Sequence, residues 1–497
     1  MAINALIDAF PTPHGAWNRV TAFGSKLRLE HRPLKAERLH TDESPRSLFV
    51  KIHEEFENAF LLESAIGPKR LAEYSFIGFE PETVVSAKGG RLAARSLDGS
   101  KDGVKTSDPL TELRALVTCP SSTPRRSPFR FVGGAVGYIS YDSVRYWERL
   151  PAKAKDDLSL PDMEFGIYSD GIAFDHIEGT VHYYTLGSEG RLEKVESLLR
   201  SAPPGGERLL GAPAPAEPTV EREEFKAMVE TAKGQIAAGD IFQVVLSKRY
   251  DFRLDGDLSV FYEALGAINP SPYMYFLKFG DRRIIGSSPE MLLRVEDRRV
   301  ETFPIAGTRP RLADKKENDR LTREMLADPK ERAEHVMLVD LARNDVGRVA
   351  SYGSVKVPEL LDVQQFSHVQ HMVSRVVGRL RPEFDSFDAM RAMFPAGTVS
   401  GAPKPRAMEI IEELEPVRRG PYAGALGYFS FNGNADFAIT IRTLVARGGR
   451  CSVQSGAGIV ADSDPDREWL ETESKAAGLM KAVERASGVP ILGEGRR

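Results

Sequence analysis

Short apolar runs, separated by turn-forming residues, dominate the first 200 residues of the chain. Runs such as YSFIGFEP and FVGGAVGYISYD have the length and boundaries that are typical of β-strands. One stretch, over residues 45–60, shows the spacing of a helix instead. The pattern therefore predicts an N-terminal part that is rich in β-structure.

From about residue 223 onward, the pattern alternates between the helical period and the strand period. Helices are predicted over residues 225–238, 321–341 and 466–486. Strands are predicted in DIFQVVLSKRYDF, in RIIGSSPEMLLRV around a turn, and in HVQHMVSRVVGRL, FAITIRTLVA and CSVQSGAGIV. This order indicates an α+β fold, in which large antiparallel sheets form a sandwich-like core with helices outside.

The most plausible linker is the segment over residues 201–223, which is rich in Pro, Ala and Gly and has no periodicity. It divides the chain into an N-terminal region, residues 1–200, and a larger C-terminal domain, residues 224–497. We therefore expect two regions that are joined by this linker.

The composition and net charge of the chain argue against several classes of partner and site. Hydrophobic residues make up 41% and charged residues 28% of the 497 residues, and the formal net charge is −4. Nucleic acids and anionic membranes are therefore not expected as partners. The N-terminus lacks a basic segment followed by a long apolar run, so a cytoplasmic protein is predicted. Two cysteines, Cys119 and Cys451, make a disulfide framework or a cysteine-based zinc site improbable.

The stretch FPAGTVSGAPKPRAMEIIEELEP combines a glycine-rich turn with an amphipathic helix. It is not a nucleotide-binding P-loop, because Gly401 is not followed by Lys and then Ser or Thr. Its backbone amides and the Thr398 hydroxyl could hold a carboxylate or a hydroxyl group. The alternative, which spacing alone favours, is an ordinary helix start with Ser400 as its N-cap.

Three residues of the last predicted helix, Glu468, Glu471 and Lys475, share one stripe because they lie at i, i+3 and i+7. Such a stripe is usually a solvated face. The alternative is a Mg²⁺ site, because Mg²⁺ takes carboxylate oxygens together with substrate and water. Glu334, at the start of an apolar helical run, is a possible third carboxylate.

Two further polar residues lie within apolar strands. A lone histidine such as His371 is more often a satisfied core residue than a catalytic one. Arg442 is less usual, since a buried guanidinium needs an anion and suits a carboxylate. The following SGAGIV adds backbone amides that no side chain obstructs. Together these features suggest a small dianionic substrate.

Five motifs occur in a specific order: PIAGTRPR, EHVMLVDLARNDVGRV, FPAGTVSGAPKPRAMEII, GYFSFNGNADFAITIRT and REWLETESKAAG. They resemble the chorismate-utilising enzymes, most closely component I of the anthranilate synthases. The resemblance covers the region from about residue 223 to the C-terminus, and LLES and YSFIGFEP extend it more loosely into the N-terminal half. It implies the chorismate-utilising fold and a lyase that converts chorismate and ammonia to anthranilate and pyruvate, the first step of tryptophan biosynthesis.

The resemblance also implies a role for each matching residue. Glu334 and Glu471, with Glu468 close by, would bind Mg²⁺, which would hold the ring carboxylate of chorismate. Glu290 would protonate the leaving hydroxyl. His371 and Thr398 would line the ring and steer the elimination of pyruvate. The residues implied in substrate binding are Tyr422, Arg442, Gly456, Gly458, Lys475 and Thr308.

Two positions bear on the choice between relatives. Isochorismate and salicylate synthases, which add water, have a lysine base where this chain has Gln243, and ammonia needs no such base. Aminodeoxychorismate synthases often carry a lysine nucleophile at the position of Ala306. Both residues favour amination at C2. Aminodeoxychorismate synthase component I and an enzyme that stops at the amino intermediate, an aminodeoxyisochorismate synthase, remain alternatives, and a non-catalytic binding protein is a more distant one.

The resemblance further implies feedback inhibition by tryptophan and a partner subunit. Glu63 would bind the ammonium of tryptophan, while Pro272 and Met274 would pack against its indole. The residues implied in this site are Leu62, Glu63, Ser64, Asn269, Pro270, Ser271, Pro272, Tyr273 and Met274. Neither cysteine lies in a Gly-Cys-Gly elbow, so a separate glutamine amidotransferase subunit, component II, would supply ammonia, and the two subunits would form a heterotetramer.

Overall fold

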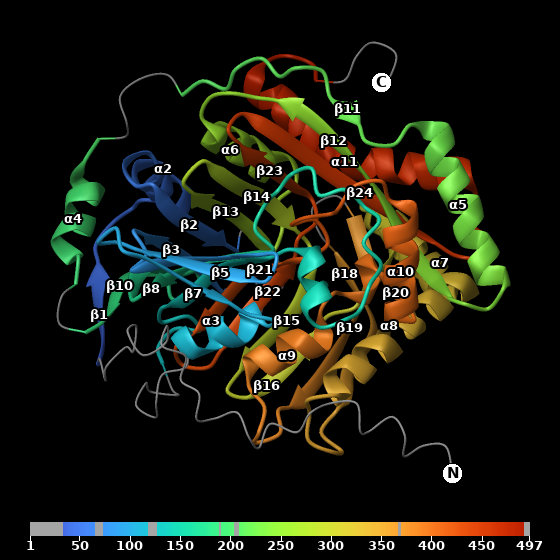
Figure 1. The fold of residues 1–497 in the computed structure, drawn as a ribbon, viewed down its shortest axis with the longest axis horizontal. Coiled ribbons are helices and arrows are strands. Elements are labelled where there is room, and N and C mark those ends of the chain that lie inside the picture. The colour runs from blue at the N-terminus through green and yellow to red at the C-terminus, as the bar shows by residue number, and fades with distance from the viewer. Residues whose placement is uncertain are drawn as a thin grey trace.

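Two antiparallel sheets of twelve strands each form the centre of the protein. The computed structural model describes residues 33–64, 73–117, 127–187, 190–202, 208–365 and 369–491. Figure 1 shows the helices around the outside of the sheets. No helix in these ranges is long and apolar enough to cross a lipid bilayer.

The first sheet contains strands from both ends of the chain. Its order is β1 (Leu34–Leu39), β10 (Thr180–Leu186), β9 (Asp170–Asp175), β3 (Tyr74–Phe79), β2 (Asn58–Glu63), β13 (Tyr273–Phe279), β14 (Arg282–Ser288), β23 (Thr443–Arg447), β24 (Arg450–Ile459), β12 (Gln243–Arg253) and β11 (Glu217–Pro218), with β20 (Gly401–Ala402) paired to β12.

The second sheet is built in the same way. Its order is β17 (Ile305–Pro310), β19 (Val369–Arg379), β16 (Arg299–Thr302), β15 (Met291–Glu296), β22 (Ala435–Ile439), β21 (Ala425–Ser430), β7 (Gly134–Ile139), β8 (Met163–Tyr168), β4 (Thr83–Lys88), β5 (Arg91–Ser96) and β6 (Lys101–Lys105), with β18 (Lys356–Gln365) paired to β19.

The sheets pack face to face through an aromatic layer, to which Phe60 and Phe76 of the first sheet and Tyr138 and Tyr428 of the second contribute. Helices cover the outer faces, and two short 3₁₀ turns complete the described elements. They are α2 (Pro45–Glu55), α3 (Pro109–Val117), α4 (Leu192–Arg200), α5 (Arg222–Ala237), α6 (Leu258–Ile268), α7 (Lys315–Ala327), α8 (Pro329–Gly347), α9 (Ser386–Met393), α10 (Lys404–Leu414), α11 (Pro465–Ser487), η2 (Tyr141–Tyr146) and η3 (Gly397–Val399). The predicted α+β sandwich with helices outside is confirmed.

The division into residues 1–200 and 224–497 stays a prediction. Strands from both regions alternate within each sheet, as where β2 pairs with β13 and β7 pairs with β21. The described part of the predicted linker is not wholly irregular, because β11 pairs with β12 and α5 begins at Arg222. Cys119 lies outside the described residues, whereas Cys451 is buried.

Two predicted helices have different boundaries in the structure. The single helix over residues 321–341 is two helices, α7 and α8, with Asp328 between them. Proline cannot continue a helix because it lacks an N–H group, so Pro329 starts a new one, and the Asp328 side chain caps it. The helix over residues 45–60 ends at Glu55, and β2 begins at Asn58.

The prediction of Ser400 as a helix N-cap is wrong. The helix begins at Lys404 after Pro403, and the glycine-rich segment before it forms η3 and β20. The Ser400 hydroxyl donates to the Ala396 carbonyl at 2.7 Å, so it stabilises the turn rather than α10. Gly401 has φ +136° and lies against the backbone of β12, which explains why a glycine is needed here.

The predicted strand FAITIRTLVA is also two strands, β22 and β23, and they belong to different sheets. Arg442, predicted inside a strand, lies in the connection between them with φ +52°. A left-handed residue cannot continue a strand, so the chain turns from one sheet into the other at this arginine.

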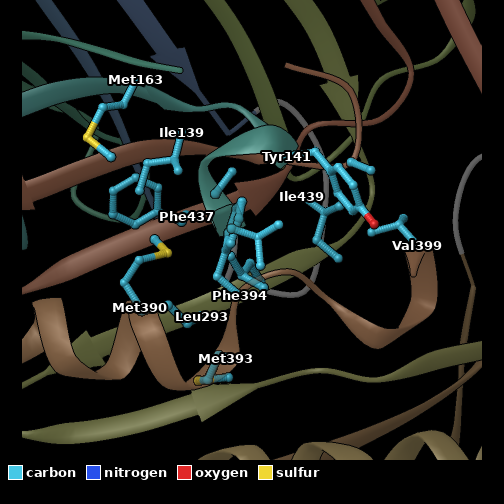
Figure 2. Packing of buried hydrophobic residues seen from close by; sticks show 14 of the residues in the cluster. Ile139, Tyr141, Met163, Leu293, Met390, Met393, Phe394, Val399, Phe437 and Ile439 are labelled. Atoms are coloured by element: carbon cyan, nitrogen blue, oxygen red, sulfur yellow. The ribbon is translucent and has the colours of Figure 1, made fainter. Parts of the chain in front are cut away.

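Packing at the second sheet provides a test of the core. Figure 2 shows Phe437 among Met163, Leu293 and Met390, and its ring centroid lies 4.7 Å from that of Phe429. Phe437 is fully buried, so Phe437→Ala is expected to destabilise the protein by about 3–5 kcal/mol. Tyr352→Ala, at a side chain that is 96% exposed, is the control. Equal changes in melting temperature for the two variants would contradict this packing.

Candidate active site

Two connections between the sheets lie side by side and define the site. One joins β14 to β15 and carries Glu290, and the other joins β22 to β23 and carries Arg442. They run together because β14 pairs with β23 and β15 pairs with β22. Backbone bonds connect them, since Ser287 N–H donates to the Arg442 carbonyl at 3.1 Å and Ile439 N–H donates to the Glu290 carbonyl at 3.0 Å.

Arg442 is a half-buried cation that no acidic side chain neutralises among the described residues. Burial lowers the pKa of its guanidinium, and nearby Tyr422 opposes this effect. Taking a charge out of water without a partner is unfavourable. The side chain is therefore suited to bind an anionic group from outside the chain, as the sequence analysis expects.

Glu290 is an acid that is poised near neutral pH. Burial raises the pKa of its carboxyl group to about 7, while the Thr398 hydroxyl and Lys475 act in the opposite direction. Thr398 lies close enough to exert this effect, although its Oγ1 makes no hydrogen bond of good geometry within the described residues. Glu290 can therefore carry a proton at a pH at which an ordinary glutamic acid has lost it.

The pairing of β20 with β12 places Gln243 opposite Ala402, four residues after Thr398 in the chain. Gln243 Nε2 donates to Glu334 Oε1 at 3.5 Å. Within the described part of the chain, Gln243 Oε1 and Thr398 Oγ1 are buried without hydrogen-bond partners. A buried polar atom without a partner is one that a bound polar ligand could satisfy.

Gly456 and Gly458 of β24 have no side chains, and Tyr422 and Gln243 lie close to their backbone in the space this leaves. A Cβ atom at Gly456 would lie 2.8 Å from the Tyr422 hydroxyl oxygen, and one at Gly458 would lie 2.6 Å from Gln243 Nε2. Lys475 Nζ donates to the Gly456 carbonyl at 2.9 Å. Any larger residue at these two positions would displace Tyr422 or Gln243.

His371 and Thr308 face each other across β19 and β17. His371 Nδ1 lies 3.0 Å from the Gly307 carbonyl and 3.1 Å from Thr308 Oγ1. A carbonyl only accepts, so the bond to Gly307 places the proton on Nδ1 and makes Nε2 the basic nitrogen. Burial lowers the pKa of His371, and Arg442 adds to the effect, so the ring is neutral near pH 7.

Three predicted metal ligands, Glu334 on α8 and Glu468 and Glu471 on α11, influence one another's charge. Burial raises the pKa of Glu334 and of Glu468, and Glu471 raises both further. Glu471 Oε1 is paired with Lys475 Nζ at 2.7 Å. Lys330, which sequence reasoning missed, also lies near Glu334 and Glu468.

The donor set of these carboxylates fits a hard cation such as Mg²⁺, because oxygen ligands that repel one another gain most from a cation between them. Their oxygens do not form one tight cluster, however. Among the described residues, the group of three whose ligand atoms all lie within 4.8 Å of one another is His53, Glu54 and Asp257. The metal assignment to the three glutamates stays a prediction.

The segments LLES and NPSPYMYF, predicted to form an allosteric site, lie side by side in the first sheet, where Glu63 is opposite Met274. Ser64 N–H donates to Ser75 Oγ at 3.3 Å, and Ser287 Oγ donates to Ser271 Oγ at 2.9 Å. Leu62, on β2, lies opposite Tyr275 of β13. The remaining members lie at or before the start of β13 and are Asn269, Pro270, Pro272 and Tyr273.

Two residues that were not predicted from the sequence, Arg46 and Tyr262, form hydrogen bonds with the Glu63 carboxylate. Arg46 Nε donates to Glu63 Oε2 at 2.8 Å, and the Tyr262 hydroxyl donates to the same oxygen at 2.7 Å. Arg46 Nη2 also lies 3.4 Å from Met274 Sδ. Both lie outside the two motifs, so only the fold brings them to Glu63.

Known proteins are similar to this chain over most of its length. The family model described as chorismate binding enzyme matches residues 57–481. The chain belongs to the chorismate-binding enzyme family. Anthranilate synthase component 1 of Methanothermobacter thermautotrophicus is 50% identical over 445 residues, which are 89% of this chain and 92% of the relative. The protein of the same name from Thermus thermophilus is 46% identical over 462 residues, covering 92% and 98%.

Solved structures of chorismate-binding enzymes share the fold. Anthranilate synthase component I from Streptococcus pneumoniae is similar with a TM-score of 0.73 and 38% identity, covering 82% of this chain and 92% of that one. The menaquinone-specific isochorismate synthase of Escherichia coli has a TM-score of 0.68 at 20% identity, covering 92% and 97%, and therefore shows the fold alone.

The raised pKa of Glu290 makes a testable contribution to stability. Below its ordinary pKa of 4.5 the carboxyl is protonated in both states, and between 4.5 and about 7 only the folded state keeps the proton. Folding stability from this group therefore falls as pH rises, by up to about 3 kcal/mol above pH 7. The melting temperature of Glu290→Gln, relative to that of the wild type, should therefore increase as the pH is raised from 5 to 8.

The matched control for this experiment is Glu230→Gln, at an exposed glutamate on α5. Its melting temperature should follow that of the wild type at each pH. A difference between Glu290→Gln and wild type that stays constant from pH 5 to 8 would contradict the raised pKa.

Proposed function

We propose that this chain is the large subunit of an anthranilate synthase, which converts chorismate and ammonia into anthranilate, pyruvate and water. The observation that carries the proposal is that the two connections bring together Glu290, a half-buried acid whose pKa burial raises to about 7, and Arg442, a half-buried cation without an acidic partner among the described residues. Chorismate offers a carboxylate for the cation and a hydroxyl leaving group for the acid. The relatives named anthranilate synthase component 1 support the same function.

Substrate binding would use Arg442 and Tyr422 for the enolpyruvyl carboxylate, together with the amides of Gly456 and Gly458. A guanidinium can bind a carboxylate through two parallel hydrogen bonds. The Tyr422 hydroxyl stays protonated at neutral pH, because burial raises its pKa. It can therefore donate to the same carboxylate.

The first chemical step would break the C4–O bond. Glu290 would give its proton to the C4 hydroxyl, which leaves as water, while ammonia adds at C2 and both ring double bonds shift, from C1–C2 to C1–C6 and from C5–C6 to C4–C5. General acid catalysis of this kind contributes roughly 10²–10⁴-fold. The oxygens of Gln243 and Thr398, which have no hydrogen-bond partner among the described residues, would accept hydrogen bonds from the attacking nitrogen.

The second step would remove the C2 proton and release pyruvate. His371 is suited to accept that proton, because its ring is neutral and Nδ1 is occupied by the Gly307 carbonyl. The bond between ring carbon C3 and the ether oxygen then breaks and the ring becomes aromatic. The enolpyruvate that leaves takes up a proton and becomes pyruvate. Thr308 fixes the plane of the imidazole.

Glu334, Glu468 and Glu471 would hold Mg²⁺, which when bound supplies positive charge for the ring carboxylate. Lys475 lies against Glu471 and the Gly456 carbonyl and adds a second positive group there. Because Glu334 also accepts from Gln243, the metal and the amination step would lie next to each other.

The identity of the product rests on Gln243 and Ala306. Neither is basic or nucleophilic, so activation of water and covalent capture of the ring are both disfavoured. Aminodeoxychorismate synthase component I and an aminodeoxyisochorismate synthase are the alternatives, and their products distinguish them.

Ammonia would come from a separate glutamine amidotransferase subunit, the component II implied by the name of component 1. Cys451 is unsuited to be a glutaminase nucleophile, because burial raises the pKa of its thiol to about 12. With high ammonium, the chain should act without a partner. The assembly with a partner would be a heterotetramer.

The activity test uses the purified chain with chorismate, ammonium and Mg²⁺. Anthranilate fluorescence and pyruvate should appear in equal amounts, and EDTA should abolish both. Glu290→Gln should lower kcat roughly 10²–10⁴-fold with little change in the KM for chorismate, because the acid acts only in the transition state. Amination at another carbon, or an amino product without pyruvate, would exclude anthranilate synthase and identify the alternative.

Feedback inhibition by tryptophan would act at Glu63. The ammonium of tryptophan would replace the Arg46 guanidinium on this carboxylate, while Met274 and Pro272 would contact the indole. Glu63 would act through β13 and β14, because β2 pairs with β13, β13 pairs with β14, and β14 leads directly to the connection that carries Glu290.

Glu63→Gln should raise the tryptophan concentration for half inhibition at least tenfold, since a charged hydrogen bond contributes about 1.5–3 kcal/mol. Inhibition is measured relative to each variant's own uninhibited rate. Glu57→Gln, at an exposed residue near the same strand, is the control and should respond like wild type. Unchanged sensitivity of Glu63→Gln would place the inhibitor elsewhere.

A further inference from the structure

Arg419 lies beneath the site, in a fully buried position outside every motif considered so far. Its side chain is 1% exposed and is paired with Glu415, to which Nε donates at 2.8 Å. Two more donors go to backbone carbonyls, since Nη1 binds Val399 at 2.7 Å and Nη2 binds Val245 at 2.6 Å. One guanidinium thus connects α10 with two other segments.

Both carbonyls belong to neighbours of site residues. Val399 directly follows Thr398 in η3, and Val245 lies two residues beyond Gln243 in β12. These segments also bind each other, because Val245 N–H donates to the Ser400 carbonyl at 3.0 Å. Arg419 therefore fixes the position of η3 relative to β12, and with it the distance between Thr398 and Gln243.

Glu415 extends the connection toward β24, the strand that carries Gly456 and Gly458. Its Oε1 accepts from Ser247 N–H and Ser247 Oγ, both at 2.8 Å, and Ser247 lies opposite Gly456 in the β12–β24 pair. Arg419 also lies over two rings, 4.7 Å from the centroid of Tyr141 and 5.7 Å from that of Tyr422. Figure 2 shows Tyr141 close to Val399 and Ile439.

We propose that Arg419 is a positioning residue for the reaction, which aligns Thr398, Gln243 and Tyr422 through the carbonyls of Val399 and Val245 and the ring of Tyr422. The inference rests on the proposed function. It differs from the role of Arg442, because Glu415 neutralises Arg419 completely and leaves no charge for a substrate.

Charge alone does not explain such an arginine. Replacing a buried ion pair by apolar residues of similar volume is often neutral for stability. A planar guanidinium, however, can serve a carboxylate and two carbonyls at once, whereas a lysine ammonium offers a single point of charge. Arg419→Lys therefore keeps the pair with Glu415 but loses the fixed geometry.

The matched control is Arg249→Lys. Arg249 is also 1% exposed and lines the same small cavity as Arg419 and Tyr422. Its guanidinium binds only the carboxylates of Asp157 and Asp251 in the described structure, and it donates to no carbonyl of the site. The two variants therefore share burial, charge and chemical change, and differ in the contacts to the site.

The experiment compares wild type, Arg419→Lys and Arg249→Lys for kcat, KM for chorismate and melting temperature. Arg419→Lys should lower kcat about 10–100-fold with KM within about threefold, since small misplacements of reacting groups cost up to roughly 10²-fold. Arg249→Lys should keep kcat within about threefold at a similar melting temperature. The split between kcat and KM is a readout that general destabilisation does not produce.

Three outcomes overturn the proposal: a kcat for Arg419→Lys within threefold of wild type, an equal loss of kcat in both variants, or a loss that appears in KM alone. If Arg419→Lys does not fold, the double variant Glu415→Met/Arg419→Met decides, because it removes both charges together. A retained kcat there overturns the proposal and a tenfold loss supports it. Wild type that forms no anthranilate would refute the proposed function instead.

Discussion

The site depends on one constraint, which is that two paired strands leave one sheet and enter the other at the same place. A strand that changes sheets leaves backbone groups that its former neighbours no longer satisfy. Here the β14–β15 and β22–β23 connections satisfy each other, through the bonds at Ser287 and Ile439. The crossing thereby holds Glu290 and Arg442 at fixed positions at the edge of a well-packed core, without using long loops.

The electrostatics follow from this placement. Burial keeps the Glu290 carboxyl protonated to about pH 7 and leaves Arg442 without an acidic partner among the described residues. Solvated positions would give an ordinary ionised acid and a hydrated cation. The left-handed backbone at Arg442, with φ +52°, is a local cost that the surrounding sheet pairs compensate.

Several strands and helices were predictable from the sequence, because their local hydrophobic patterns are strong. The period of HVQHMVSRVVGRL predicts β19, which the structure confirms. The anion site that the unusual arginine in an apolar run indicates stays a prediction. The strand switch at Arg442 was not predictable, since an apolar run that changes sheets has the same pattern as one that does not. Arg46 and Arg419 escaped for another reason: their partners, Glu63 and the carbonyls of Val399 and Val245, are brought to them only by tertiary contacts.

The interleaving of early and late strands has a consequence for how the chain acquires its structure. During synthesis β2 emerges more than 200 residues before its neighbour β13, and β7 waits longer still for β21. Until then the N-terminal part of the nascent chain exposes unpaired strand edges and its share of the aromatic layer. Both kinds of surface promote aggregation. We infer that assembly is dominated by contacts between distant segments, so that folding is slow and early chain termination yields an aggregation-prone fragment rather than a smaller domain.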